Sequence, residues 1–196
     1  MSSLGAVIIK KSNTAQLKKR YDQERWLQAA LDILAKDGGA KLRVSALAAS
    51  LNVTKGSFYH HFSNRSEFVA KVTEYWASKF TAIVIDEIGE LPCHGKDKLR
   101  EVMRLVAQKD LDKYDMAFRS WAAQDTLVAN EVKKVDQNRQ RFIRTIFEEM
   151  GFTGVDLETR LRAWLVYASS NRSVSFQSTQ ESEEPTPDDF LEFFTS

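Results

Sequence analysis

The side chains best suited to chemistry gather in residues 54–65, which read TKGSFYHHFSNR. Hydroxyl, ammonium and imidazole groups follow one another here, and such groups donate hydrogen bonds to phosphate oxygens and to the edges of base pairs. Gly56 lies among them, and a glycine lets the backbone approach a partner closely. The stretch therefore indicates binding to a nucleic acid.

The remaining reactive groups do not form a catalytic or metal-binding pattern. The chain has three histidines and one cysteine. On a helix the adjacent His60 and His61 point about 100° apart, so they cannot bind one metal ion together. No glycine-rich phosphate loop, nucleophile elbow or zinc-binding helix motif is present. We therefore predict that the protein is not an enzyme and uses no metal or cofactor.

Two short helices with a tight turn between them must position this stretch. In residues 44–51, small and apolar side chains recur at helical spacing, which predicts the first helix. Asn52 follows, and after glycine asparagine most readily adopts the left-handed conformation that ends a helix. Thr54 is a good N-cap for the second helix, on which Phe58 and Phe62 share a face.

Two short helices joined in this way describe a helix-turn-helix, whose second helix fits a major groove about 12 Å wide. A further helix at residues 23–36 carries an apolar stripe that should cover them. The predicted core of the domain is Trp26, Ala29, Ala30, Ile33, Leu34, Leu47, Leu51, Val53, Phe58 and Phe62. From spacing alone, a helical hairpin inside an ordinary all-α core is the alternative interpretation.

The segment LAASLNVTKGSFYHHFSNRSEFV, residues 47–69, closely resembles the DNA-binding signature of the TetR family of bacterial transcriptional regulators. It departs from that signature at Asn52, where the family usually has glycine. The resemblance implies a recognition helix that begins at Lys55 and Gly56, with Lys55 reaching guanine or phosphate and His61 binding phosphate. The DNA-binding residues implied by the resemblance are Ser45, Thr54, Lys55, Gly56, Ser57, Tyr59, His60, His61 and Arg65.

The charge distribution agrees with a DNA-binding N-terminal region. The chain of 196 residues has a net charge of +1, but residues 1–65 hold eleven basic and four acidic residues, a net charge of +7. The remainder holds 17 basic and 23 acidic residues, a net charge of −6. A basic region of this kind is typical of phosphate binding. We expect residues 1–21 to form a flexible basic arm, from which Lys18, Lys19 and Arg20 could reach a minor groove; a tail without function is the alternative.

The rest of the chain predicts helices throughout, so the fold class is all-α with about nine helices. We expect helices at residues 65–90, 96–109, 116–124, 128–150, 157–169 and 188–195, and a loop at 176–187. The first of these is long enough to join two domains. The predicted domains are the arm at 1–21, a helix-turn-helix domain at 22–66, and an effector-binding and dimerisation domain at 67–196.

The resemblance implies that this second domain binds a small-molecule effector and forms a homodimer. An effector pocket is expected among Phe80, Phe118, Trp121, Gln124, Trp164 and Tyr167, and a dimer interface along Leu161, Trp164, Leu165 and Ala168. The alternative for both sets is ordinary core packing within one chain.

The sequence thus predicts a dimeric DNA-binding regulator, a repressor released from its operator by a small molecule. The single cysteine fits a reducing cytoplasm and no apolar run approaches the length of a membrane span, so we expect a cytoplasmic protein without membrane contact. The alternative is a helical protein-interaction module that has kept the helix-turn-helix shape without binding DNA.

Overall fold

The structure is a computed structural model that describes residues 23–108, 112–170 and 185–196. The predicted basic arm, with Lys18, Lys19 and Arg20, lies outside the described residues. Throughout the described ranges the regular structure is helical, with no β-strand, which confirms the all-α class. The chain divides into two compact units, Met1–Tyr75 and Trp76–Ser196, here called unit 1 and unit 2. The predicted boundaries at residues 21 and 66 stay a prediction.

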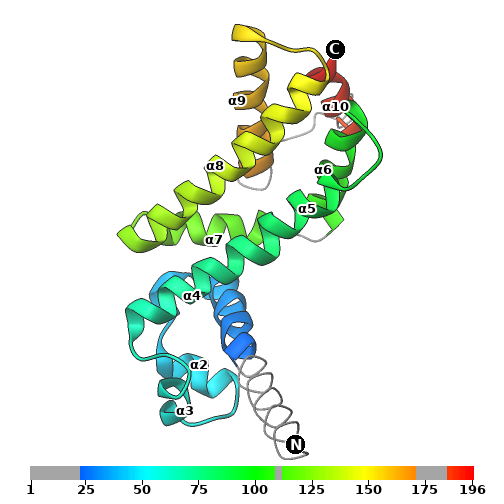
Figure 1. Cartoon of the computed structure of the whole chain (residues 1–196). Helices are drawn as coiled ribbons and strands as arrows, with labels where there is room; N and C mark the ends of the chain where they lie inside the picture. The colour runs from blue at the N-terminus through cyan, green and yellow to red at the C-terminus, as the bar shows by residue number, and fades with distance from the viewer. Residues whose placement is uncertain (1–22, 109–111, 171–184) are drawn as a thin grey trace, which may run out of the picture. The chain divides into compact units, whose positions relative to one another are not determined.

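Unit 1 contains the predicted three-helix arrangement (Figure 1). Residues 23–37 are helical, and a short 3₁₀ segment, η1 (Gly39–Lys41), leads to α2 (Val44–Ser50), α3 (Lys55–Tyr59) and the start of α4 (Arg65–Ala77). Phe58 of α3 is the centre of the core, with ring centroids 5.6 Å from Trp26, 5.0 Å from Phe62 and 5.1 Å from Phe68. These aromatic contacts hold α3 against the first helix and α4.

The turn between α2 and α3 depends on Asn52, which has φ +55° and is the one non-glycine residue with a positive φ in the described ranges. The amide of Asn52 donates to the carbonyl of Ala49 at 3.1 Å, and that of Val53 donates to Ala48 at 2.9 Å. This pair of bonds is the Schellman arrangement that ends a helix at a left-handed residue. The predicted role of Asn52 is confirmed. The prediction that Val53 belongs to the core was wrong, because this residue is 44% exposed.

Two side chains cap the start of α4. Asn64 Oδ1 accepts a hydrogen bond from the Glu67 amide at 2.9 Å, and Glu67 Oε2 accepts one from the Ser63 amide at 2.8 Å. Two backbone N–H groups that a helix start leaves unpaired are thereby satisfied. The caps fix the point at which the chain leaves α3 and enters the long helical segment.

Helical residues continue without a break from Arg65 to Gly89, through α4, the π-helical segment η2 (Ser78–Ala82) and α5 (Ile83–Gly89). The predicted helix at 65–90 is therefore confirmed in extent, but the π-helical segment was not predicted. Thr81 lies in η2 with 4% of its surface exposed. π-helical turns inside α-helices are frequent at functional sites, which draws attention to the groups around Thr81.

Unit 2 continues with α6 (Lys96–Gln108), α7 (Asp112–Ala122), α8 (Thr126–Glu149), α9 (Gly154–Ser170) and α10 (Pro187–Thr195). Helix α8 is the central element, since it packs on α6, α7 and α9, while α10 packs on α6 (Figure 1). The N-cap of α8, Asp125, accepts a hydrogen bond from the Leu127 amide. At the start of α10, Thr186 and Asp189 form a complete capping box.

The predicted dimer stripe on α9 needs correction. Leu161 is 2% and Trp164 5% exposed, and both belong to the hydrophobic core of unit 2. Leu165 and Ala168 are partly buried against that core. Side chains so buried within one chain have little surface left for a second copy, so the apolar stripe is mainly intra-chain core. The exposed large apolar side chains of α9 are Val155 and Val166, at 84% and 65% exposure.

Candidate nucleic-acid interface and ligand cavity

The residues predicted to contact DNA all lie in unit 1 and reach the surface. Seven of the nine are exposed: Ser45, Thr54, Lys55, Gly56, Tyr59, His60 and Arg65. The other two, Ser57 and His61, are partly buried. They come from the start of α2, the length of α3 and the start of α4, as the helix-turn-helix motif requires.

The two sides of helix α3 differ sharply in burial. Phe58 is 1% exposed whereas the neighbouring Tyr59 is 63% exposed, with its ring edge-on to Phe58 at 5.3 Å. The core contact orients the Tyr59 ring while its surface remains open to a partner. The hydroxyls of Thr54 and Ser57 lie 3.2 Å apart at the start of the helix. Thr54 occupies the predicted N-cap position, although its side chain makes no hydrogen bond to the helix backbone.

Gly56 is not required by packing within the chain. A Cβ built at this residue would meet only Thr54 Oγ1, at the ordinary contact distance of 3.6 Å. The surface beside Gly56 is therefore open in the described structure. A partner backbone, such as a phosphodiester strand, could approach there to the distance that a glycine permits.

His61 is held more firmly than the other predicted contacts. Its ring centroid lies 6.4 Å from that of Trp26, and its backbone carbonyl accepts a hydrogen bond from Gln23 at 3.3 Å. These contacts fix the ring at the edge of the core, so any contact it makes with a phosphate would come from its exposed edge.

The segment that carries these residues has charges of a single sign. Residues 38–66 contain no aspartate or glutamate and four basic residues, Lys41, Arg43, Lys55 and Arg65, all of which are exposed. A segment that carries only positive charge attracts the phosphate backbone.

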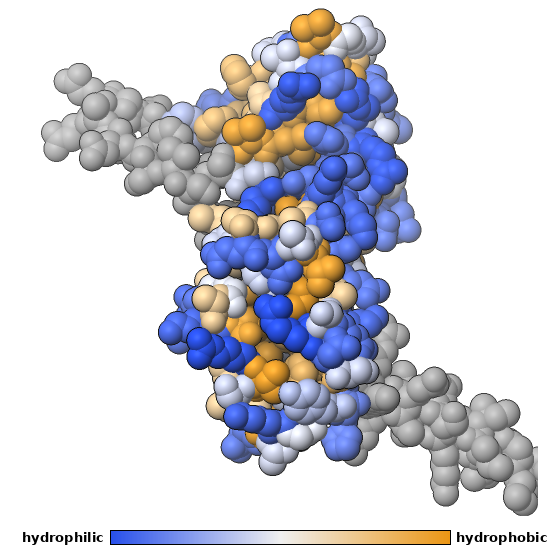
Figure 2. Space-filling model, turned by 90° about the vertical axis from the view of Figure 1, so that its left-hand side faces the viewer, coloured by the Kyte–Doolittle hydropathy of each residue, from blue (hydrophilic) through white to orange (hydrophobic). Residues whose placement is uncertain are grey.

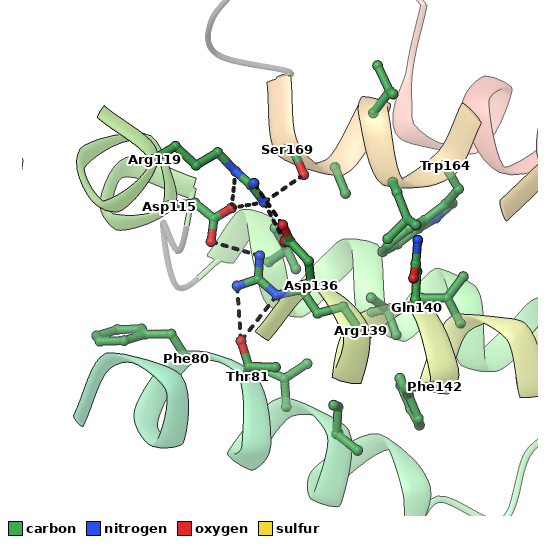
Figure 3. A pocket seen from close by; sticks show the side chains of 18 residues that line it. Phe80, Thr81, Asp115, Arg119, Asp136, Arg139, Gln140, Phe142, Trp164 and Ser169 are labelled. Carbon is green, nitrogen blue, oxygen red and sulfur yellow. Dashed lines mark hydrogen bonds and ion pairs between the residues drawn. The ribbon is translucent and has the colours of Figure 1, made fainter. Parts of the chain in front are cut away.

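A second candidate site is a cavity of about 360 Å³ that lies wholly within unit 2 (Figure 3). Its apolar wall includes Phe80, Val84, Val106, Phe142, Ile143 and Trp164. Its polar wall consists of Thr81, Asp115, Arg119, Asp136, Arg139, Gln140 and Ser169. A mainly apolar hollow with a few convergent polar groups is the usual form of a small-molecule site.

Six of these seven polar residues form one connected network, which does not include Gln140 (Figure 3). Arg119 donates to both carboxylate oxygens of Asp136, at 3.0 and 2.7 Å, and from Nε to Asp115 at 3.2 Å. Arg139 pairs with Asp115 at 2.7 Å and donates two hydrogen bonds to the Thr81 hydroxyl, at 3.1 and 3.0 Å. The network therefore joins α7 and α8 to the π-helical segment η2.

Local sequence spacing explains why these groups meet. Asp115 and Arg119 lie four residues apart on α7, and Asp136 and Arg139 lie three apart on α8, so each pair shares one helix face. The hydrogen bonds to Asp136, followed by the nearby negative charges, raise the pKa of Arg119 above its ordinary value despite its partial burial. Arg119 thus remains fully charged within the cavity wall.

The sequence predicted only part of this cavity. Phe80 and Trp164 line it as expected. Phe118 does not, because it stacks on Trp76 with ring centroids 4.2 Å apart and is fully buried. Trp121 packs 5.9 Å from Phe118, and Tyr167 packs on Phe190 and Phe194 at 4.6 and 5.5 Å.

Gln124 lies on the exposed turn after α7 and also does not line the cavity. The sequence analysis did not predict the charged and hydroxyl residues of the polar wall. Among them, Asp115 and Arg119 carried the clearest sequence signal. Their spacing of four residues was the available signal, although the same spacing is common on solvent-exposed helices.

The family model described as "Bacterial regulatory proteins, tetR family" matches residues 27–72, which span the first helix, α2, α3 and the first half of α4. The match coincides with the residues that build the exposed helix-turn-helix. Residues 27–72 therefore resemble the DNA-binding domain of the TetR family of transcriptional regulators.

Among solved structures, the chain is similar to a protein from Pseudomonas aeruginosa PAO1 described as a candidate transcriptional regulator. The two share 14% sequence identity with a TM-score of 0.62, over 89% of this chain and 87% of that one. The likeness extends through both units and shows a common fold. No curated protein sequence matches the chain.

Two features are absent from the described residues. None of the described helices combines the length and apolar character needed to cross a membrane. Within the same ranges, no three His, Cys, Asp or Glu side chains lie close enough together to hold a metal ion.

Proposed function

We propose that the chain is a TetR-family regulator that binds duplex DNA by placing α3 in the major groove, acts as a homodimeric repressor in the cytoplasm, and is released from its operator by a small molecule. The exposed face of α3 is the observation that carries the proposal. Lys55 and Tyr59 of α3 and His60 at its end are exposed, while Phe58 anchors the opposite side of the helix, and the segment 38–66 contains no acidic residue.

Within this proposal the residues have separate roles. Lys55, Ser57 and Tyr59 contact bases or phosphates from α3, while Ser45 and Arg65 hold the phosphates on either side from the starts of α2 and α4. Phosphate contacts fix the register of the protein, and base contacts supply sequence preference. In a homodimer the two α3 helices would enter successive major grooves about 34–36 Å apart on a roughly palindromic site.

The proposed dimer uses the exposed face of α9. Val155, Arg162 and Val166 recur at intervals of seven and four residues, so they share one face, and all three are exposed. Figure 2 shows apolar side chains interrupting the hydrophilic surface on one side of the molecule. A Val166→Glu variant should sediment as a monomer, whereas Lys133→Glu, an exposed change on α8, should leave the dimer intact. A dimeric Val166→Glu variant would exclude this face.

The proposed effector binds in the cavity of unit 2. The cavity wall includes Thr81 of η2, and helical residues connect η2 to Arg65 at the edge of the proposed DNA surface. A ligand that binds one conformation of η2 more tightly than another would shift the population between operator-binding and released states. The release depends on this difference in affinity and not on tight binding alone.

The test of DNA binding begins with recovery of preferred sites from random duplex DNA, since such a selection finds the operator sequence directly. In a gel-shift assay, Tyr59→Ala and Lys55→Ala should weaken binding to the selected site by about tenfold to a hundredfold. Lys71→Ala, a lysine on α4 that pairs with Glu74, is the matched control and should bind nearly as the unchanged protein does. Full binding by Tyr59→Ala, with the helical circular dichroism retained, would contradict the proposal.

The alternative is an interaction module that keeps the helix-turn-helix shape without binding DNA. It predicts that DNA affinity is weak and nearly independent of salt, because few counterions would be released. The proposal predicts a steep fall of affinity with salt. Turnover of a compound bound in the cavity would be needed to support an enzyme.

A further inference from the structure

The charged groups of the unit 2 cavity balance one another. Two guanidinium groups, those of Arg119 and Arg139, face two carboxylates, those of Asp115 and Asp136. The formal charge of the described polar wall is therefore zero. The cavity wall therefore offers an effector strong dipoles, but it has no net charge that could neutralise a charge on the effector.

The guanidinium groups are also largely occupied. Arg119 uses Nε and both terminal nitrogens on Asp115 and Asp136, with one further contact of 3.4 Å to Ser169 Oγ. Arg139 uses its three nitrogens on Thr81 and Asp115. A carboxylate on the ligand would have to displace Asp136 from Arg119 and leave that aspartate beside a second negative charge.

A ligand ammonium group would meet the opposite difficulty. It could approach the Asp136 carboxylate, whose side chain is 41% exposed, but it would then lie beside Arg119. The buried Asp115, with a side chain 5% exposed, is already paired with both guanidinium groups. Moving either kind of ion from water into this hollow carries a desolvation cost that no unpaired counter-charge in the described wall repays.

A neutral hydrogen-bonding group meets neither difficulty. Each oxygen of Asp136 accepts a hydrogen bond from Arg119 and has room for a second, which a hydroxyl can supply.

We propose that the cavity selects an electrically neutral, amphipathic small molecule with an apolar body and a hydroxyl or similar polar end, and discriminates against carboxylates and amines of the same shape. The apolar wall with Phe80, Phe142 and Trp164 would hold the body, and the Asp136 end of the network would hold the polar group (Figure 3). A volume of about 360 Å³ lies near the small end of the usual range of ligand sites, roughly 300–1,000 Å³. This inference rests on the proposed function, since it names the chemical class of the effector.

The test compares three probes with one body and three polar ends: phenylbutanol, phenylbutanoate and phenylbutylamine. Their affinities for the full chain without DNA are measured by calorimetry at neutral pH. The alcohol should bind about tenfold more tightly than either the acid or the amine. Binding of the acid or the amine as tight as that of the alcohol, or no saturable binding of any probe, would overturn the proposal.

Two substitutions shift the charge of the cavity and sharpen the test. Asp136→Asn leaves the wall with a charge of +1 and should improve the affinity for phenylbutanoate by about tenfold. Arg119→Gln leaves it with −1 and should favour phenylbutylamine instead. Glu131→Gln is the matched control, because it removes one carboxylate from an outward part of α8 that does not line the cavity. Equal preferences in all these variants would show that the network does not select by charge.

Parallel gel shifts keep this inference separate from the proposed function. If the protein binds its selected DNA but none of the probes, the ligand class is wrong while the DNA-binding function stands. If the alcohol binds selectively but leaves the DNA complex intact, the ligand class stands, and release by a compound of this class is contradicted.

Discussion

The pair of Arg139 and Asp115 gives the sharpest energetic test of unit 2. Arg139 loses three interactions if its guanidinium is removed: the 2.7 Å ion pair with Asp115 and the two hydrogen bonds to Thr81. Breaking a buried pair costs about 3–5 kcal/mol, but the Arg139 side chain is 23% exposed and Asp115 keeps Arg119 as a partner. We therefore expect Arg139→Gln to lower the free energy of unfolding of unit 2 by about 2–3 kcal/mol.

A double-mutant cycle separates this interaction from general damage. Asp115→Asn alone should cost about 2 kcal/mol, and the double variant should cost about 1–2 kcal/mol less than the sum, because the second change removes a group already left without its partner. Arg141→Gln, an exposed change on the same helix, should stay within about 0.5 kcal/mol of the unchanged protein.

The assay is urea unfolding followed by tryptophan fluorescence in a Trp26→Phe background. The remaining tryptophans, at positions 76, 121 and 164, all belong to unit 2 and report on its unfolding. If the two substitutions prove additive within about 0.3–0.5 kcal/mol, the network does not act as one unit and the reasoning is refuted.

Two further predictions concern the turn and the acid response. Asn52→Ala should lower the unfolding free energy of unit 1 by about 1 kcal/mol, because alanine disfavours a φ of +55°. Asn52→Gly should not destabilise unit 1, because glycine adopts this conformation readily. Thermal melts of both variants measure the two effects, and equal losses of stability would contradict the role given to Asn52. A hydrogen bond from Lys98 and, to a smaller extent, one from the Gly95 amide hold the pKa of Glu149 below its ordinary value of 4.5. The ionised Glu149 therefore stabilises the fold above pH 4.5, and this contribution is lost as the pH falls through the lowered pKa. Glu149→Gln should therefore cost about 0.5–1 kcal/mol at neutral pH and almost nothing in strong acid, and a pH-independent difference between variant and unchanged protein would show that the charge is not responsible.

The parts of this fold that sequence reasoning predicted depend on local preferences. Asn52 adopts φ +55° because few residues other than glycine tolerate that conformation, so its identity alone marked the turn. The contrast between Phe58 and Tyr59 followed from helical spacing. Each of these features is set by residues within a few positions of one another.

The parts that were missed depend on contacts between distant residues. Thr81 and Arg139 are 58 residues apart, and nothing around either of them marks the π-helical segment or its place in the cavity wall. An apolar stripe predicts burial but does not say against what. Leu161 and Trp164 are buried as the pattern indicates, yet within one chain rather than between two. For the same reason the aromatic rings of Phe118 and Trp121 fill the core instead of lining the cavity.

The most direct test of the central claim is a chemical footprint of the protein on its selected duplex. A dimer that presents two α3 helices predicts two protected patches in successive major grooves, with centres about 10 base pairs apart. Both patches should disappear with Tyr59→Ala at the same protein concentration. A single patch, protection confined to the minor groove, or an unchanged footprint for Tyr59→Ala would contradict the account.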